Sequence, residues 1–98
     1  MNLMSDFRKY LEKQLNNEKF KKEWDNSESE YYLARSLATA RKENNMTQNE
    51  LAEKTGINQA DISKIENGNA NPALSTLKRL AEGMGMRLRL EFIPKKFR

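Results

Sequence analysis

Apolar residues recur every three or four positions along most of this chain, which predicts a series of amphipathic helices. The first apolar stripe lies in residues 5–16, and a shorter stripe follows the Asn16-Asn17 pair on a strongly charged background. The large apolar residues of these two stripes are Phe7, Tyr10, Leu11, Leu15, Phe20 and Trp24. A longer helix is expected after the turn-like residues 25–30, where Ser27 and Glu30 fit a capping box, to about Asn44.

Two shorter helices are predicted next, each with its own start and stop signals. Thr47 and Glu50 fit a second capping box, and Gly56 is expected to end that helix in the left-handed conformation. Asn58 caps the following helix, which stops at Gly68 and turns its isoleucines, Ile62 and Ile65, toward the core. Pro72 suits the first position of a further helix, whose inner stripe is Leu74, Leu77, Leu80 and Ala81.

The apolar period changes from helical to alternating after Gly83 and Gly85. The apolar members of this alternation are Met86, Leu88, Leu90 and Phe92, and Pro94 ends it, which predicts a half-buried β-strand. A single strand is not stable alone, and no second strand is evident in the sequence. We therefore expect this strand to pair with its symmetry mate across a homodimer axis. The alternative, a strand packed on its own helices, stays open.

Composition restricts the chemistry that this chain can perform. It has 98 residues, 37% of them apolar and 33% charged, which suits one small domain with a modest helical core. The chain has neither cysteine nor histidine, so disulfides, the usual zinc sites and histidine-based catalytic triads are excluded. Glu28 and Glu30 lie close together in sequence but without a neighbouring base, and there is no glycine-rich phosphate loop. We expect no catalytic residue, no metal and no cofactor, and hence not an enzyme.

No apolar run approaches the length of a membrane span, and the N-terminus lacks the apolar core of a secretory signal. The sequence therefore predicts a cytoplasmic protein without a membrane partner. The net charge of the chain is +4. Residues 1–30 hold six Lys/Arg and seven Asp/Glu, so their own net charge is −1. The excess positive charge lies in residues 31–98, with a net of +5, which favours a phosphate-bearing partner.

The short connection between Gly56 and Asn58 forces the two helices on either side of it to cross steeply, as in a helix-turn-helix. Ile57 then faces inward at the corner. The second helix projects Gln59, Ala60, Ser63 and Lys64 outward from its first two turns. In a major groove, Gln can pair with adenine, Lys can donate to guanine and Ala can contact a thymine methyl. A polar, solvated helix face is the alternative for such a helix taken alone.

The surrounding residues, "TQNELAEKTGINQADISKIENGNANPALSTLKRLAEGMG" at 47–85, resemble the XRE family of helix-turn-helix regulators, the type of phage repressors and Cro. The Thr-Gln-x-Glu-Leu-Ala motif, a Gly nine residues after the Thr, Ile-Ser-x-Ile-Glu-x-Gly and the following Pro all match in register, and the resemblance spans residues 33–85. It implies a mainly α fold, a five- to six-helix helix-turn-helix domain at residues 31–85. An N-terminal helical extension, residues 1–30, and a C-terminal β-strand and tail, residues 86–98, flank this domain.

The resemblance implies roles for individual residues. The base-facing positions of the recognition helix are Gln59, Ala60, Ser63 and Lys64, and Asn58 precedes them. Gln48 matches a phosphate-contacting Gln, and the loop positions that meet the DNA backbone are Asn67, Asn69 and Asn71. Arg41 and Glu66 match a largely buried salt bridge. Asp61 departs from a DNA-facing pattern; it either accepts from a cytosine amino group or caps its own helix, three residues after Asn58.

The whole layout resembles antitoxins of the HigA type, from HigB/HigA toxin–antitoxin operons, in which a strand like "RLRLEFIP" follows the XRE domain. This resemblance implies a HigB/RelE-like toxin partner that cleaves mRNA, and repression of the chain's own operon by a dimer bound to a palindromic double-stranded DNA operator. A free-standing XRE regulator of the prophage-repressor type, without a toxin partner, is the alternative.

Residues 1–30 are the candidate toxin contact, because large apolar side chains outside a DNA-binding core suit a partner's groove. The expected contact residues are Phe7, Tyr10, Leu11, Leu15, Phe20 and Trp24. Acidic residues of the same segment could complement a basic ribonuclease. The alternative is that these apolar residues pack only on the chain's own helices.

Overall fold

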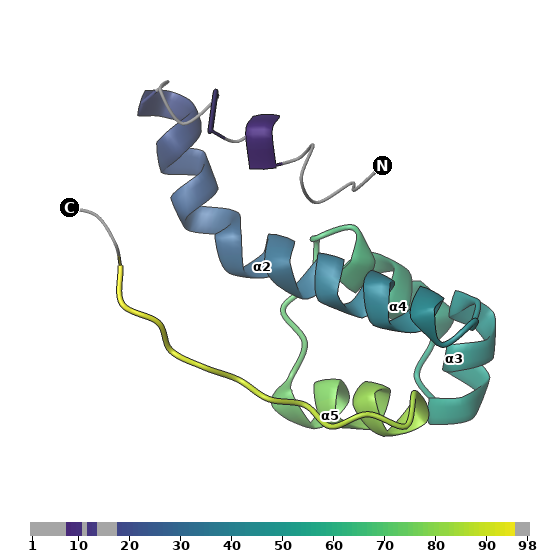
Figure 1. Cartoon of the computed structure of the whole chain (residues 1–98). Helices are drawn as coiled ribbons and strands as arrows, with labels where there is room; N and C mark the ends of the chain where they lie inside the picture. The colour runs from purple at the N-terminus through teal and green to yellow at the C-terminus, as the bar shows by residue number, and fades with distance from the viewer. Residues whose placement is uncertain (1–7, 11, 14–17, 96–98) are drawn as a thin grey trace.

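The chain folds into helices joined by short turns (Figure 1). The structure, a computed structural model, describes residues 8–10, 12–13 and 18–95. Residues 8–10 and 12–13 are helical, and the longer helices are α2 (Glu18–Glu43), α3 (Gln48–Thr55), α4 (Gln59–Glu66) and α5 (Leu74–Gly83). Within the described residues, none of these helices is long and apolar enough to cross a membrane. The expectation of a mainly α fold is confirmed.

Helix α2 is continuous for 26 residues, so the turn predicted at residues 25–30 is wrong. The Ser27 hydroxyl donates to the Glu23 carbonyl oxygen at 3.0 Å, one helical turn earlier, and does not cap a new helix. This is how serine satisfies its hydroxyl inside a helix. The helix ends at Glu43, and Asn45 in the turn that follows has a left-handed φ of 56°. Because α2 runs across position 30, the division between residues 1–30 and 31–85 has no break in the backbone, and it stays a prediction.

The start and stop signals around α3 act as expected. The Glu50 amide donates to Thr47 Oγ1 at 3.0 Å, and the Thr47 amide donates to Glu50 Oε1 at 2.8 Å, which completes the capping box. Gly56 has a φ of 76°, and its amide donates to the Ala52 carbonyl oxygen at 2.8 Å. Both local predictions are confirmed. Only residues 56–58 then separate α3 from α4.

Helix α4 is bounded by side-chain and backbone caps. The Ala60 amide donates to Asn58 Oδ1 at 3.2 Å, which confirms Asn58 as the N-cap. At the other end Gly68 has a φ of 76°, and its amide donates to the Ile65 carbonyl oxygen at 3.0 Å. The next amide, of Asn69, donates to the Lys64 carbonyl oxygen at 2.9 Å, which completes the paired bonds of a Schellman motif.

The core lies between α2, α3, α4 and α5, with α4 packed on α2 and α3, and α5 packed on α3. Its centre is formed by three fully buried side chains, those of Leu51, Ile62 and Leu80. Around them lie Leu37, Ala52, Ile57 and Ile65. The predicted inward positions of the isoleucines are therefore confirmed.

Helix α5 begins later than the sequence predicts. Ala73 is its N-cap and Leu74 its first residue, so Pro72 precedes the helix rather than opening it. The predicted inner stripe is also too long, because Leu74 is 54% exposed. The reason is that α3 contacts only the second half of α5, at Arg79 and Gly83. The first turn of α5, which contains Leu74, is left uncovered by α3.

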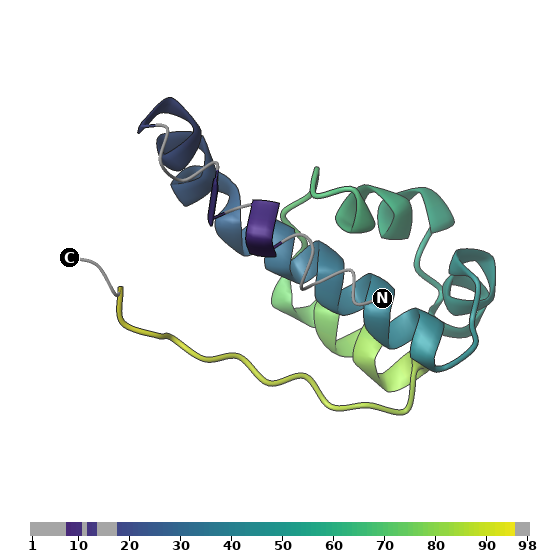
Figure 2. The ribbon, with the colours of Figure 1, turned by 45° about the horizontal axis from the view of Figure 1, so that its top comes forward.

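Within the described residues no strand forms after α5, so the predicted β-strand of Met86, Leu88, Leu90 and Phe92 is not supported. Residues 86–95 first run back along α5 and then leave the body of the molecule (Figures 1 and 2). A strand requires a neighbour that satisfies its amides and carbonyls, and a single chain supplies none here. Phe92 and Ile93 are consequently exposed.

Candidate nucleic-acid interface

Helix α4 has one face in the core and one face in solvent. Ile62 and Ile65 are 0% and 2% exposed, which fixes the helix to α2 and α3. On the opposite face Gln59, Ala60 and Lys64 are exposed, as the sequence predicted for base-facing positions. A short helix with amide and ammonium groups on its outer face has the chemistry to enter a major groove.

Two polar residues of α4 are placed less simply. Ser63 is half-buried, and its Oγ accepts a hydrogen bond from Asn67 Nδ2 at 3.5 Å. Asp61 is exposed in the first turn. The Asn58 cap is directed at Ala60, and no hydrogen bond within the described residues joins Asp61 to the Asn58 amide. The capping role suggested for Asp61 thus has no contact to support it, and its carboxylate faces the same solvent as Lys64.

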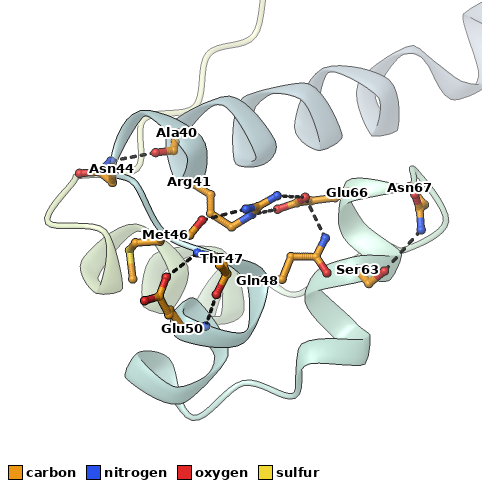
Figure 3. Close-up of polar contacts among 10 residues, drawn as sticks. All are labelled: Ala40, Arg41, Asn44, Met46, Thr47, Gln48, Glu50, Ser63, Glu66 and Asn67. Atoms are coloured by element: carbon orange, nitrogen blue, oxygen red, sulfur yellow. Dashed lines mark hydrogen bonds and ion pairs between the residues drawn. The ribbon is translucent and has the colours of Figure 1, made fainter.

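The Arg41–Glu66 pair named from the sequence joins α2 to the end of α4 (Figure 3). Arg41 Nε donates to Glu66 Oε2 at 2.7 Å, and Arg41 Nη2 donates to Glu66 Oε1 at 2.9 Å. The exposed fractions of the two side chains are 11% and 8%. Arg41 Nη1 also donates to the Met46 carbonyl oxygen at 2.8 Å, so one guanidinium ties α2, the turn after it and α4 together.

Electrostatics keep Glu66 charged. Burial of the carboxylate raises its pKa, but hydrogen bonds from Arg41 and Gln48, together with the charges of Arg41 and Lys42, lower it by more. The net effect is a pKa below the ordinary value of 4.5. The hydrogen bond to Glu66 in turn raises the pKa of Arg41. The bridge is therefore fully ionised at neutral pH.

Gln48 is half-buried beside this bridge. Its Nε2 donates to Glu66 Oε1 at 3.0 Å, and its side chain points toward Glu66 (Figure 3). This bond occupies one N–H of the amide and leaves the second for an outside acceptor such as a phosphate oxygen. The sequence identified the position of Gln48 but not its bond to Glu66, since the two residues are 18 positions apart.

The loop between α4 and α5 contributes neutral donors. Its three asparagines, Asn67, Asn69 and Asn71, are all exposed. One further residue supports the corner and was missed by sequence reasoning. Arg79 Nη2 donates at 2.6 Å to the carbonyl oxygen of Thr55, the last residue of α3. Its partner is a backbone atom 24 residues away, and no sequence pattern marks such a contact.

The candidate toxin-contact residues are only partly described. Phe7, Leu11 and Leu15 lie outside the described residues, as does the side chain of Phe20. Tyr10 is exposed. Trp24 is half-buried, and its ring centroid lies 5.3 Å from that of Tyr31 and 6.0 Å from that of Tyr32. Trp24 thus packs on tyrosines of its own helix, in line with the alternative that the sequence left open, and burial raises the pKa of Tyr31.

Comparison with known proteins shows the family to which this helical arrangement belongs. Residues 37–90 match the model of the helix-turn-helix family HTH_3. The chain belongs to this family. The match covers the C-terminal end of α2 from residue 37, all of α3, α4 and α5, and the beginning of the C-terminal segment. Helix α4 is therefore the second helix of an XRE-type helix-turn-helix.

Relatives of this HTH_3 domain include named antitoxins and solved regulators. Antitoxin HipB of Escherichia coli K12 is 38% identical over 58 residues, which cover 59% of this chain and 66% of HipB; HipB of a second strain, CFT073, is covered to 62%. The chain thus spans just under two thirds of these relatives. Among solved structures, the restriction-modification controller protein C.Esp1396I, a tetramer in complex with its natural 35 base-pair operator, matches with a TM-score of 0.56 and 26% identity. That match covers 58% of this chain and 75% of the controller protein.

Proposed function

We propose that this chain is a dimeric, operator-binding repressor of its own operon and an antitoxin that neutralises a toxin encoded beside it. The DNA-binding part rests on one observation above all. Helix α4 is fixed by two buried isoleucines on one face and exposes Gln59, Ala60 and Lys64 on the other. A rigid helix that presents such groups is the element that reads base edges in helix-turn-helix proteins.

Contacts to phosphate supply the remaining affinity. The free N–H of the Gln48 amide and the exposed amides of Asn67, Asn69 and Asn71 can donate to backbone oxygens and fix the register of α4 on the duplex. Since these side chains are neutral, the salt dependence of binding comes from the excess Lys and Arg of residues 31–98.

A palindromic operator requires two copies of α4 related by a two-fold axis. The C-terminal segment is the proposed source of this dimer, because its backbone lacks a ladder partner within the described residues and its apolar Leu90 and Phe92 are exposed. Pairing of two such segments would supply hydrogen-bond partners to the backbone and would also cover the exposed apolar side chains. The operator-bound tetramer of the controller protein is a solved relative in which several copies act on one duplex.

The antitoxin part is supported by similarity to HipB antitoxins. This similarity favours a toxin partner in general and does not distinguish the HigA type. The more specific proposal, a HigB/RelE-like ribonuclease bound by residues 1–30, therefore stays a prediction from the sequence. Within that segment the aromatic ring of Tyr10 is exposed. Trp24 is half-buried against Tyr31 and Tyr32, and the part of it that remains accessible could also contact a toxin.

Two experiments test the two parts separately. Gel-shift titration should show that the chain binds DNA from upstream of its own gene more tightly than a scrambled duplex, by a factor of about 10³ or more. Equal affinity for both duplexes would contradict operator recognition. For the antitoxin part, a tagged chain should co-purify with the untagged product of the adjacent gene. Specific DNA binding without any captured neighbour would instead support a free-standing XRE regulator.

A further inference from the structure

The C-terminal segment has two chemically different sides even in the single chain. Leu88 and Leu90 line a groove against α5. On the other side Arg89 Nη2 lies 2.6 Å from Glu91 Oε2, and these side chains are 83% and 59% exposed. Successive side chains of an extended chain alternate in this way. Leu88 and Leu90 therefore lie toward α5, where Arg87 also lines the groove, whereas Arg89 and Glu91 lie toward solvent.

Among the described residues, 8–10, 12–13 and 18–95, no side chain fills the groove beside α5. It has a volume of about 390 Å³, and its apolar wall includes Leu74, Ala81, Leu88 and Leu90. Phe92 is the exposed apolar residue next along the same face, with a relative exposure of 107%. Phe92 does not line this groove, whereas Leu90, two residues earlier, does, and the chain then leaves α5 (Figure 2). A second copy of the chain carries the same Phe92 on a free, extended segment.

The sequence around Leu90 is self-complementary when two copies run antiparallel. A two-fold axis at Leu90 sets Arg89 of each copy opposite Glu91 of the other, and Leu88 opposite Phe92. An axis at Arg89 or at Glu91 would set like charges directly opposite each other, which is destabilising. A register shifted by a single residue would place Leu90 opposite Glu91 and so put apolar side chains against charged ones.

We propose that two copies pair residues 87–93 antiparallel around Leu90, with two Arg89–Glu91 pairs between the chains and each Phe92 entering the groove beside Leu88 of the other copy. This rests on the dimer of the proposed function and specifies its register, its anchor and its selectivity for a second copy. The exposed Arg89–Glu91 contact within one chain contributes little, so exchanging it for pairs between chains costs little. Burying the exposed Phe92 side chain removes its apolar surface from water and so favours the dimer.

Charge reversal tests the register. Arg89→Glu alone and Glu91→Arg alone each create two like-charge pairs in a homodimer, and each should weaken dimerisation about tenfold in sedimentation at low salt. An equimolar mixture of the two variants should restore wild-type affinity as a heterodimer, because every cross-chain pair is then opposite in sign. Lys54→Glu makes the same charge change as Arg89→Glu on α3 and should leave the dimer unchanged. Arg89 and Glu91 are exposed, so the helical fold should survive, which circular dichroism checks.

The outcomes separate the register from the proposed function. Restoration by mixing supports the register, since a contact within one chain is not repaired by another chain. Variants that dimerise like wild type, or a mixture no stronger than its parts, overturn the register while leaving a dimeric repressor standing. A wild-type chain that is monomeric alone and on operator DNA overturns both.

The anchor is tested with two neighbouring residues. Phe92→Ala should weaken the dimer about tenfold or more, whereas Ile93→Ala, on the opposite side of the strand, should change it less than threefold. Both residues are exposed in the single chain, so neither change removes core packing. Equal effects of the two substitutions would overturn the assignment of Phe92 to the groove.

Discussion

A single carboxylate, that of Glu66, positions the candidate DNA-contacting groups. Both of its oxygens accept hydrogen bonds from Arg41, and one also accepts from Gln48. Arg41 in turn holds the turn before α3 through the Met46 carbonyl oxygen. The orientation of α4 and of the Gln48 amide therefore depends on one ion pair that itself need not touch DNA.

Replacement of this carboxylate should be costly. Glu66→Gln leaves the Arg41 guanidinium largely buried without a counter-charge, and we expect a loss of about 3 kcal/mol in the free energy of unfolding. Urea denaturation measures this loss. Glu53→Gln, the same change at an exposed position of α3, is the matched control and should lie within about 0.5 kcal/mol of wild type. Equal stability of the two variants would show that the bridge is unimportant.

The same residue predicts the direction of a pH dependence. The pKa of Glu66 in the folded chain lies below its ordinary value of 4.5, so its ionised form is stabilised by folding. This contribution is complete above the unfolded pKa and is lost as the pH falls through the folded one. Stability should therefore decrease as the pH drops below 4.5, and Glu66→Gln should show a shallower decrease. Parallel curves for both proteins would contradict the assignment.

At the scale of the helices, the sequence correctly predicted the helix ends that are set by hydrogen bonds between residues close together in the chain. Thr47, Gly56, Asn58 and Gly68 act within four or five residues of chain, and each bounds its helix as the sequence predicts. Ser27 fits the same capping pattern and fails, since a serine inside a helix can instead bond to the preceding turn. Sequence alone could not decide between these two outcomes.

Long-range packing decided the remaining features. The exposure of Leu74 depends on where α3 ends against α5, and residues 86–95 have no strand partner within the described part of the chain. The bond between Gln48 and Glu66 joins residues distant in sequence. The outward positions of Gln59, Ala60 and Lys64 were thus predictable from helix spacing, while Gln48 and the loop asparagines were named from family resemblance. The contacts that hold these residues were not predictable, except for the Arg41–Glu66 pair, which the resemblance also implies.

The close approach of α3 and α5 gives a test at this scale. A β-carbon at Gly83 would overlap Thr55 Cγ2 and lie 3.3 Å from Leu51 Cδ1. Thr55 cannot rotate freely, because its Oγ1 donates to the Leu51 carbonyl oxygen at 2.8 Å and accepts from the Ile57 amide at 3.2 Å. Gly83→Ala should therefore destabilise the chain by about 1–3 kcal/mol in thermal or urea unfolding, despite alanine's higher helix propensity.

A second substitution isolates the cause. Thr55→Ser keeps the hydroxyl and removes the methyl that alanine would meet, so Gly83→Ala in that background should be neutral or stabilising. If the cost of Gly83→Ala is the same in both backgrounds, contact with Thr55 is not its origin.

For the whole molecule, the chain is half of a symmetric DNA-binding unit in our account. Each copy supplies one α4, and the C-terminal segments set the separation of the two. Because two-fold symmetry of the protein is mirrored in the operator, the half-site spacing follows from how these segments pair. The N-terminal part of α2 extends away from this core (Figure 1) and so leaves room for a toxin without covering α4.

The central claim is that the exposed face of α4 reads base edges, and paired binding isotherms test it most directly. The affinities of wild type, Gln59→Ala, Lys64→Ala and the off-face control Lys54→Ala should be measured for upstream operator DNA and for a scrambled duplex at one salt concentration. We expect each α4 substitution to weaken operator binding about tenfold or more, with a smaller loss on scrambled DNA, and the control to reduce both affinities equally and modestly. Losses that are the same on both duplexes for all three variants would contradict base reading by α4.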